Sequence, residues 1–104
     1  MARSKTYVIA WKSTKQINFL TFYDNNGVKT AVEAYNYSAK IYDMDYNLVA
    51  ELPVERQQTG LYYVKIDTLA LNLQPGEYYL EFLCVVGGNS YARRDKILVS
   101  LLEY

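Results

Sequence analysis

Residues that favour turns interrupt this chain at short intervals along most of its length. The signals are Asn25-Asn26-Gly27, Asp45-Tyr46-Asn47, Thr59-Gly60, Pro75-Gly76 and Gly87-Gly88-Asn89. Between them lie short runs rich in Tyr, Val, Ile and Phe, which are residues that fit a pleated, half-buried surface. Short runs bounded by Gly, Asn and Pro are typical of a β-sandwich or barrel. The pattern therefore predicts an all-β fold.

Alternation within the runs predicts which side chains face the core. Residues 77–86 carry apolar groups at every second position, and the Gly-Gly-Asn turn joins them to 91–102 as a hairpin. We expect the inward series of the last strand to continue through Ile97, Val99 and Leu101. The run 17–23 is apolar on both faces, which predicts a central strand. Residues 68–74 carry Leu at every second position before Pro75, and we interpret them as a crossover loop with room for one short turn.

The segment around Pro75-Gly76 carries the most specific fold signal. In immunoglobulin-like sandwiches a Tyr near the start of strand F bonds back to the backbone at the preceding corner. Tyr78 follows Pro75-Gly76 and occupies that place, so we interpret it as a fold residue. We also expect Gly60, in the turn before the run 61–67, and Tyr62, near the start of that run, to be fold-determining residues. We expect one immunoglobulin-like β-sandwich over residues 1–104, of about seven or eight antiparallel strands, with 1–12 an N-terminal arm or edge strand.

The ionisable residues argue against catalysis. The chain has no His, which removes the commonest general base and zinc ligand, and its single Cys excludes an internal disulfide. Lys and Arg balance Asp and Glu at 11 each, whereas proteins that bind nucleic acid normally carry a positive excess. We expect a protein that is not an enzyme, has no cofactor or metal, and does not bind nucleic acid as its main partner.

Two motifs resemble reactive sites and are better explained by structure. Residues 43–47 match the first half of a calcium loop, but Leu48 stands where that loop needs Gly and Val54 where it needs Glu. Asp and Asn favour turns in any case. Cys84 lies in an apolar alternation without a neighbouring Lys or His, which predicts a buried, inert thiol.

The apolar run Tyr7–Trp11 is too short for a targeting or membrane segment. A signal peptide needs about 7–15 apolar residues and a membrane helix about 20. We expect that the protein does not associate with a membrane. We also expect that it is assembled in a cytoplasmic compartment.

Tyrosine is the unusual component of the composition, with 12 Tyr against three Phe and one Trp. Tyr serves as a strand residue and also suits surfaces that bind another protein. We predict contact residues near the chain ends, at Tyr7, Trp11, Leu102 and Tyr104. Arg93 and Arg94 form the densest basic cluster. That cluster fits a salt-bridged subunit contact, a charged edge that blocks stray strand pairing, or an arginine–aromatic patch for phosphates.

The order of these signals resembles a known family. The matching motifs are Lys5-Thr6-Tyr7-x-Ile9, Ile17-x-Phe19, Thr59-Gly60-x-Tyr62-x-Val64, Pro75-Gly76-x-Tyr78-x-x-x-Phe82 and Arg94-x-x-Ile97-x-Val99. They are similar to the N-terminal β-sandwich of phage upper-baseplate proteins and related virion modules. In those proteins an immunoglobulin-like domain attaches a fibre or receptor-binding part to the particle.

The resemblance implies a non-enzymatic structural subunit of a bacteriophage particle, either a baseplate or tail adaptor or a capsid auxiliary (decoration) protein. Its partners would be other virion structural proteins, including copies of itself, and it would reside in the virion after assembly in the host cytoplasm. The alternative is an immunoglobulin-like recognition module for glycan or a cell-surface ligand, with exposed Tyr as stacking platforms.

Overall fold

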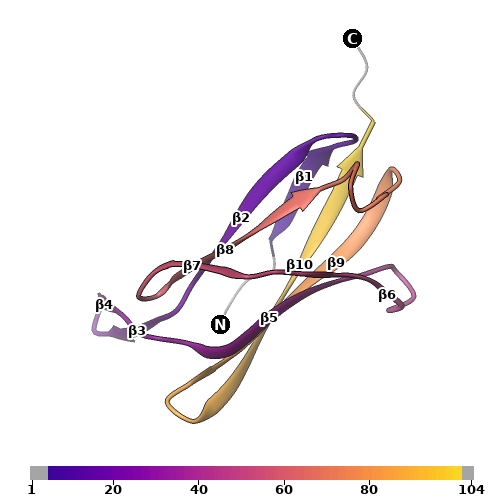
Figure 1. The fold of residues 1–104 in the computed structure, drawn as a ribbon. Helices are drawn as coiled ribbons and strands as arrows, with labels where there is room; N and C mark the ends of the chain where they lie inside the picture. The colour runs from indigo at the N-terminus through magenta and orange to yellow at the C-terminus, as the bar shows by residue number, and fades with distance from the viewer. Residues whose placement is uncertain (1–4, 102–104) are drawn as a thin grey trace.

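Two β-sheets face each other in the computed structural model, which describes residues 5–101 (Figure 1). The larger sheet has the order β1-β10-β9-β5-β6, and its strands are β1 (Thr6–Ala10), β10 (Asn89–Ser100), β9 (Gly76–Val86), β5 (Tyr35–Tyr42) and β6 (Leu48–Leu52). The smaller sheet has the order β2-β8-β7, with β2 (Thr14–Leu20), β8 (Leu61–Asp67) and β7 (Glu55–Gln58). A separate hairpin consists of β3 (Phe22–Asn25) and β4 (Val28–Ala31). The predicted all-β sandwich is therefore confirmed.

The described residues form ten strands, more than the seven or eight expected. The added pair is the β3–β4 hairpin, which turns at Asn26 and Gly27, both with positive φ (53° and 84°). Asn-Gly is the favoured pair for such tight hairpins, so this short segment pairs with itself. One pairing also departs from the antiparallel pattern, because β1 runs parallel to β10 with Thr6 opposite Lys96 and Ala10 opposite Ser100.

The inner faces of both sheets supply one core. The alternation predicted for β9 is present, since Leu80, Phe82, Cys84 and Val86 are all buried, and β9 and β10 form the expected hairpin. The ring of Phe82 stacks on Phe19 of the opposite sheet, with centroids 4.2 Å apart. Close packing of this kind between two sheets is the main stabilising contribution in a sandwich.

Two predictions about strand position are wrong. The run 17–23 is not a central strand, because β2 lies at the edge of its sheet and ends at Leu20. The chain leaves the strand at Thr21, whose amide donates to the carbonyl of Gly60 (3.0 Å) while its carbonyl accepts from Val32 (3.1 Å). The inward series on β10 also stops early, because Leu101 lies beyond the strand and is 52% exposed.

The corner before β9 has the geometry that the immunoglobulin-like interpretation expects. The hydroxyl of Tyr78 donates to the carbonyl of Gln74 across 2.8 Å, and Gly76 has a φ of 147°. Residues 68–74 form a loop of turns, in which the buried Leu73 donates its amide to the Thr68 carbonyl. The loop is thus closed onto the core at the point where β9 begins.

Of the other two predicted fold residues, Tyr62 lies on β8 of the smaller sheet and Gly60 lies in the turn between β7 and β8. Tyr62 is fully buried, and its hydroxyl accepts a 2.8 Å hydrogen bond from the amide of Ala34. Gly60 has a φ of 77° and packs directly against Thr21 and Ala31.

No helix long and apolar enough to cross a bilayer occurs between residues 5 and 101.

Candidate functional site: an apolar pocket at one end of the sandwich

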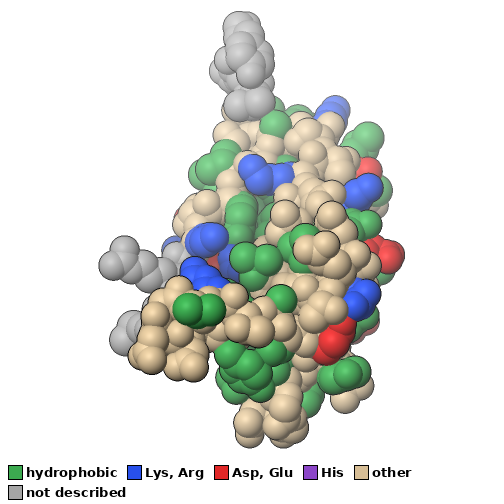
Figure 2. Space-filling view, turned by 90° about the vertical axis from the view of Figure 1, so that its left-hand side faces the viewer, with side chains coloured by type: hydrophobic (Ala, Val, Ile, Leu, Met, Phe, Trp, Pro, Cys, Tyr) green, Lys and Arg blue, Asp and Glu red, His purple; other side chains and the backbone are tan. Residues whose placement is uncertain are grey.

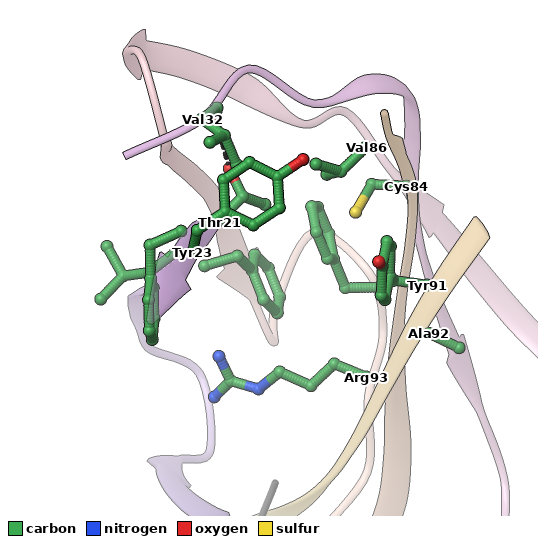
Figure 3. A pocket seen from close by; sticks show the side chains of 12 residues that line it. Thr21, Tyr23, Val32, Cys84, Val86, Tyr91, Ala92 and Arg93 are labelled. Atoms are coloured by element: carbon green, nitrogen blue, oxygen red, sulfur yellow. Dashed lines mark hydrogen bonds between the residues drawn. The ribbon is translucent and has the colours of Figure 1, made fainter. Parts of the chain in front are cut away.

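A pocket of about 350 Å³ lies between the two sheets near the β9–β10 hairpin (Figure 3). Residues from both sheets and from the β3–β4 hairpin line it: Phe19, Leu20, Thr21, Phe22, Tyr23, Val32, Phe82, Cys84, Val86, Tyr91, Ala92 and Arg93. The lining is mostly apolar and includes several aromatic rings. Concave apolar surfaces of this kind are where proteins take up ligands or partner side chains.

The pocket exists because the chain changes direction at Thr21. Its hydroxyl donates to the carbonyl of Val32 across 2.6 Å, which ties the base of the β3–β4 hairpin to the end of β2. Phe22 and Tyr23 therefore leave the plane of the smaller sheet and form one wall. Tyr91, just after the β9–β10 turn, stands on the other side (Figure 3).

Arg93 provides the charge at the edge of the pocket and is held by three contacts. Its Nε lies 2.8 Å from Oδ2 of Asp95, and its Nη2 donates to the hydroxyl of Tyr7 across 2.7 Å. The guanidinium carbon is 5.3 Å from the ring centroid of Phe19, a distance typical of a cation–π contact. The positive charge is therefore neutralised and fixed in place within the domain.

Cys84 lines the pocket as a buried thiol, 5% exposed. Burial raises the pKa of the Cys84 thiol, because the thiolate loses its solvation. Since the thiolate is the nucleophile, this environment supports packing and not reaction.

Several large apolar side chains at the pocket are exposed to solvent. Leu20, Phe22, Tyr23 and Tyr91 are 62%, 40%, 55% and 51% exposed, respectively. Figure 2 shows hydrophobic side chains gathered in the lower part of the face that carries β3 and β4, beside a group of Lys and Arg side chains. Exposed apolar side chains that gather beside polar residues are common at sites where proteins bind a partner or a ligand.

The structure brings together two of the six predicted contact residues. Tyr7 and Arg93 are hydrogen-bonded near the pocket, both partly buried. Trp11 follows the far end of β1, with Lys12 over its ring, and Arg94 points to the outer face of the large sheet, where it pairs with Glu81 at 2.8 Å. Leu102 and Tyr104 lie outside the described residues. Both arginines thus make ion pairs within the chain.

The calcium-loop motif is a turn in this structure. Oδ1 of Asp43 accepts the amides of Asp45 and Asn47, each at 2.9 Å. These hydrogen bonds stabilise the ionised form and lower the pKa of Asp43. Within residues 5–101 no group of three or more His, Cys, Asp or Glu side chains could hold a metal ion.

The pocket walls were not apparent as a site in the sequence. Leu20, Phe22 and Tyr23 fit a continuous strand by pattern. The available signal was the aromatic pair Phe22-Tyr23 just before the Asn-Asn-Gly turn, together with Tyr91 just after the Gly-Gly-Asn turn. Aromatic residues beside tight turns are exposed unless another element covers them.

The comparisons with known proteins identify the fold and no family. No family model matches the chain, and no curated protein matches it. Among solved structures, an engineered protein is similar with a TM-score of 0.66 and 5% identity, over 94% of this chain and 18% of that one. The endo-beta-1,4-mannanase from Thermotoga petrophila is similar with a TM-score of 0.60 and 18% identity, over 96% of this chain and 18% of the mannanase chain. A DUF4785 family protein from Legionella pneumophila is similar with a TM-score of 0.58 and 11% identity, over 92% of this chain and 26% of that one. The chain therefore spans 18–26% of the length of these solved proteins, and the likeness is one of fold alone.

Proposed function

We propose that this chain is a non-enzymatic structural subunit of a bacteriophage particle and binds neighbouring virion proteins through the pocket end of the sandwich. The observation that carries the proposal is the apolar pocket with Leu20, Phe22, Tyr23 and Tyr91 exposed around it. Burying such side chains against a partner yields about 25 cal/mol per Å² of apolar surface removed from water. Aromatic anchors also supply much of the affinity in protein interfaces.

The chemistry of the pocket supports adhesion over catalysis. No carboxylate is among the described residues that line it, and its cation, Arg93, is already neutralised by Asp95. Cys84 has a raised pKa, which disfavours its role as a nucleophile. A carboxylate that acts as general acid or base has to lie within hydrogen-bond distance of the substrate. The described residues that line the pocket offer no such carboxylate.

The assignment to a phage particle is supported by the resemblance of the turn-and-strand motifs to virion β-sandwich modules. It fits a role as a baseplate or tail adaptor or as a capsid auxiliary protein. The similar solved proteins are several times longer than this chain, so folds of this kind also serve as parts of larger proteins.

Analysis of purified particles tests the proposal. Particles from a lysate of the host that encodes the chain are banded on a density gradient, cross-linked and examined by mass spectrometry. We expect the chain at a fixed ratio to other virion proteins, with cross-links from Lys29, whose ammonium lies 4.9 Å from the ring centroid of Phe22. Absence of the chain from the banded particles would refute the proposal.

A glycan-recognition module is the second candidate, and a different surface favours it. On the outer face of the large sheet the rings of Tyr46 and Tyr79 stack with centroids 4.8 Å apart, and Arg94 lies 5.4 Å from the Tyr46 ring. Tyr46 is 51% exposed and offers a flat platform for a sugar ring. Glycan-array binding that is lost in Tyr46→Ala and kept in Tyr91→Ala would favour this candidate over the first.

A further inference from the structure

The β3–β4 hairpin projects from the sandwich and pairs with itself. Every residue of the two strands is exposed, and among residues 5–101 neither strand pairs with another element. Within the same range no hydrogen bond joins residues 22–31 to the rest of the domain. A segment with few buried contacts and solvent-exposed backbone hydrogen bonds opens at a low cost in free energy. The hairpin is therefore the part of the pocket wall that moves most readily.

The chain enters and leaves this hairpin through one pair of residues, Thr21 and Val32. The carbonyl of Thr21 accepts the amide of Val32 (3.1 Å), and its hydroxyl donates to the Val32 carbonyl (2.6 Å). On one side of the pair, Leu20 still belongs to β2. On the other side, Ala34 is buried and donates its amide to the hydroxyl of Tyr62 across 2.8 Å. Thr21 and Val32 thus lie between two anchored segments, which is the position of a hinge.

Tyr23 reaches from the hairpin across the pocket to the β9–β10 turn. A Cβ atom built on Gly87 of that turn would lie 3.1 Å from the Tyr23 hydroxyl oxygen, so the hydroxyl rests against the turn. Figure 3 shows the Tyr23 side chain directed toward Val86 and Cys84. Val86 and Cys84 are only 7% and 5% exposed. The side chain of Tyr23 therefore lies over the end of the pocket that contains the thiol.

We propose that the β3–β4 hairpin is a hinged flap over the pocket, which turns about Thr21 and Val32 and closes when Tyr23 packs against Gly87. The described structure is the closed form. Opening withdraws Phe22 and Tyr23 from the pocket and exposes Cys84 to solvent. A flap of this kind determines when a pocket is entered. The inference goes beyond the proposed function, because it holds whichever partner the pocket binds.

Cys84 supplies a probe of flap opening, because it is the single Cys of the chain and lines the pocket. The reagent is the aromatic disulfide dithiobis(nitrobenzoate). The Cys84 thiolate attacks its S–S bond, forms a mixed disulfide and releases one thionitrobenzoate anion, while the thiol proton passes to the buffer. The absorbance of the released anion gives the labelling rate at a fixed pH. Thermal unfolding checks that each variant is folded.

The urea dependence of the labelling rate separates flap opening from unfolding of the whole domain. Opening of a hairpin exposes little new surface, so at urea concentrations below the unfolding transition the wild-type rate should change by less than about twofold per molar urea. Labelling through global unfolding would instead rise about tenfold or more per molar urea, because global unfolding exposes far more surface.

Two pairs of variants test the closing residue and the hinge. Tyr23→Ala should label about tenfold faster than wild type, since it removes the packing that holds the flap closed. Tyr23→Phe keeps the ring and should label at nearly the wild-type rate. Thr21→Val deletes the hydroxyl bond at the hinge, leaves Tyr23 in place and should label about fivefold faster. Thr30→Val is its control, because Thr30 is exposed within the same hairpin and should label like wild type.

Four results would overturn the inference. Wild-type labelling that tracks global unfolding from the lowest urea concentration would mean that the hairpin does not open. A wild-type rate in Tyr23→Ala would mean that Tyr23 does not close the pocket. Faster labelling of Tyr23→Ala with no change in Thr21→Val would mean a static cover, and equal acceleration by Thr21→Val and Thr30→Val would remove the hinge. Absence of the chain from phage particles would refute the proposed function alone, since it leaves these labelling rates unaffected.

Discussion

Asp95 is buried next to the guanidinium of Arg93, and Nε of the arginine lies 2.8 Å from Oδ2 of the aspartate. The two residues are two positions apart on β10, so both side chains point to the inner face. Oδ2 accepts no well-aligned hydrogen bond from the described residues, so the contact is chiefly electrostatic. Oδ1 accepts the amide of Lys5 at 3.0 Å. The Asp95 carboxylate thereby holds Arg93 in place at the edge of the pocket and also holds Lys5 in place just before β1.

Asp95→Asn should destabilise the domain by about 2–3 kcal/mol. The substitution leaves the charge of Arg93 without its counterion in a partly buried place, and the arginine side chain is 28% exposed, which limits the loss. The double variant Arg93→Met/Asp95→Leu removes both charges and should cost less than the single substitution. Urea unfolding measures both free energies. A double variant less stable than Asp95→Asn would contradict this account.

Tyr78→Phe should lower the free energy of unfolding by about 1 kcal/mol, because it deletes the hydrogen bond to the Gln74 carbonyl. The ring stays, so packing at the corner is unchanged. Tyr35→Phe is the control, since Tyr35 is 62% exposed and its loss of a hydroxyl should have little effect. Equal effects of the two substitutions in urea unfolding would show that the corner bond contributes nothing specific.

Gly60→Ala should be more damaging than Gly88→Ala. Both glycines have a positive φ, 77° and 81°, so an alanine at either position incurs backbone strain of about 1 kcal/mol or more. At Gly60 the added Cβ would also lie 2.7 Å from the carbonyl oxygen of Thr21 and 2.8 Å from Cβ of Ala31, whereas at Gly88 the space is open. Thermal unfolding of both variants gives the difference in melting temperature that is due to steric overlap at Gly60, because the backbone strain is similar at the two positions. Matching melting temperatures would disprove a close approach at Gly60.

Glu33 should make stability sensitive to acid. Its hydrogen bonds from Arg56 and Thr59 lower the pKa of Glu33 from 4.5 to about 2. A lowered pKa in the folded state means that the carboxylate stabilises the fold fully above pH 4.5 and that this contribution is lost as the pH falls towards 2. Wild type and Glu33→Gln should therefore differ in urea midpoint above pH 4.5 and converge near pH 2. A constant difference across that range would contradict the assignment.

The elements that sequence analysis predicted best are those fixed by local patterns. The inward series of β9 follows from alternation, and the β9–β10 hairpin follows from Gly87-Gly88-Asn89. The Tyr78 corner follows from a spacing of a few residues. Each depends on residues that are neighbours in the chain, so no knowledge of the tertiary structure was needed.

The pocket could not be predicted because it depends on contacts between distant segments. Thr21 breaks the strand through hydrogen bonds with Gly60 and Val32, and neither partner is apparent from the sequence around Thr21. The hydrogen bond between Arg93 and Tyr7 could not be predicted for a similar reason. Tyr7 lies at the other end of the chain, and the meeting of the two requires the pairing of β1 with β10.

The parallel pairing of β1 with β10 has a mechanical consequence. Thr6 lies opposite Lys96 and Ala10 opposite Ser100, so the first strand begins at one end of this ladder and the last strand finishes at the other. Tension applied at the start of β1 and the end of β10 is directed along the strands and shears them past each other. All the hydrogen bonds of the ladder then share the load and must rupture together, whereas a hairpin pulled from its open end unzips one bond at a time. Force applied at these two strand ends therefore meets more resistance than the same force applied at the open end of the β9–β10 hairpin.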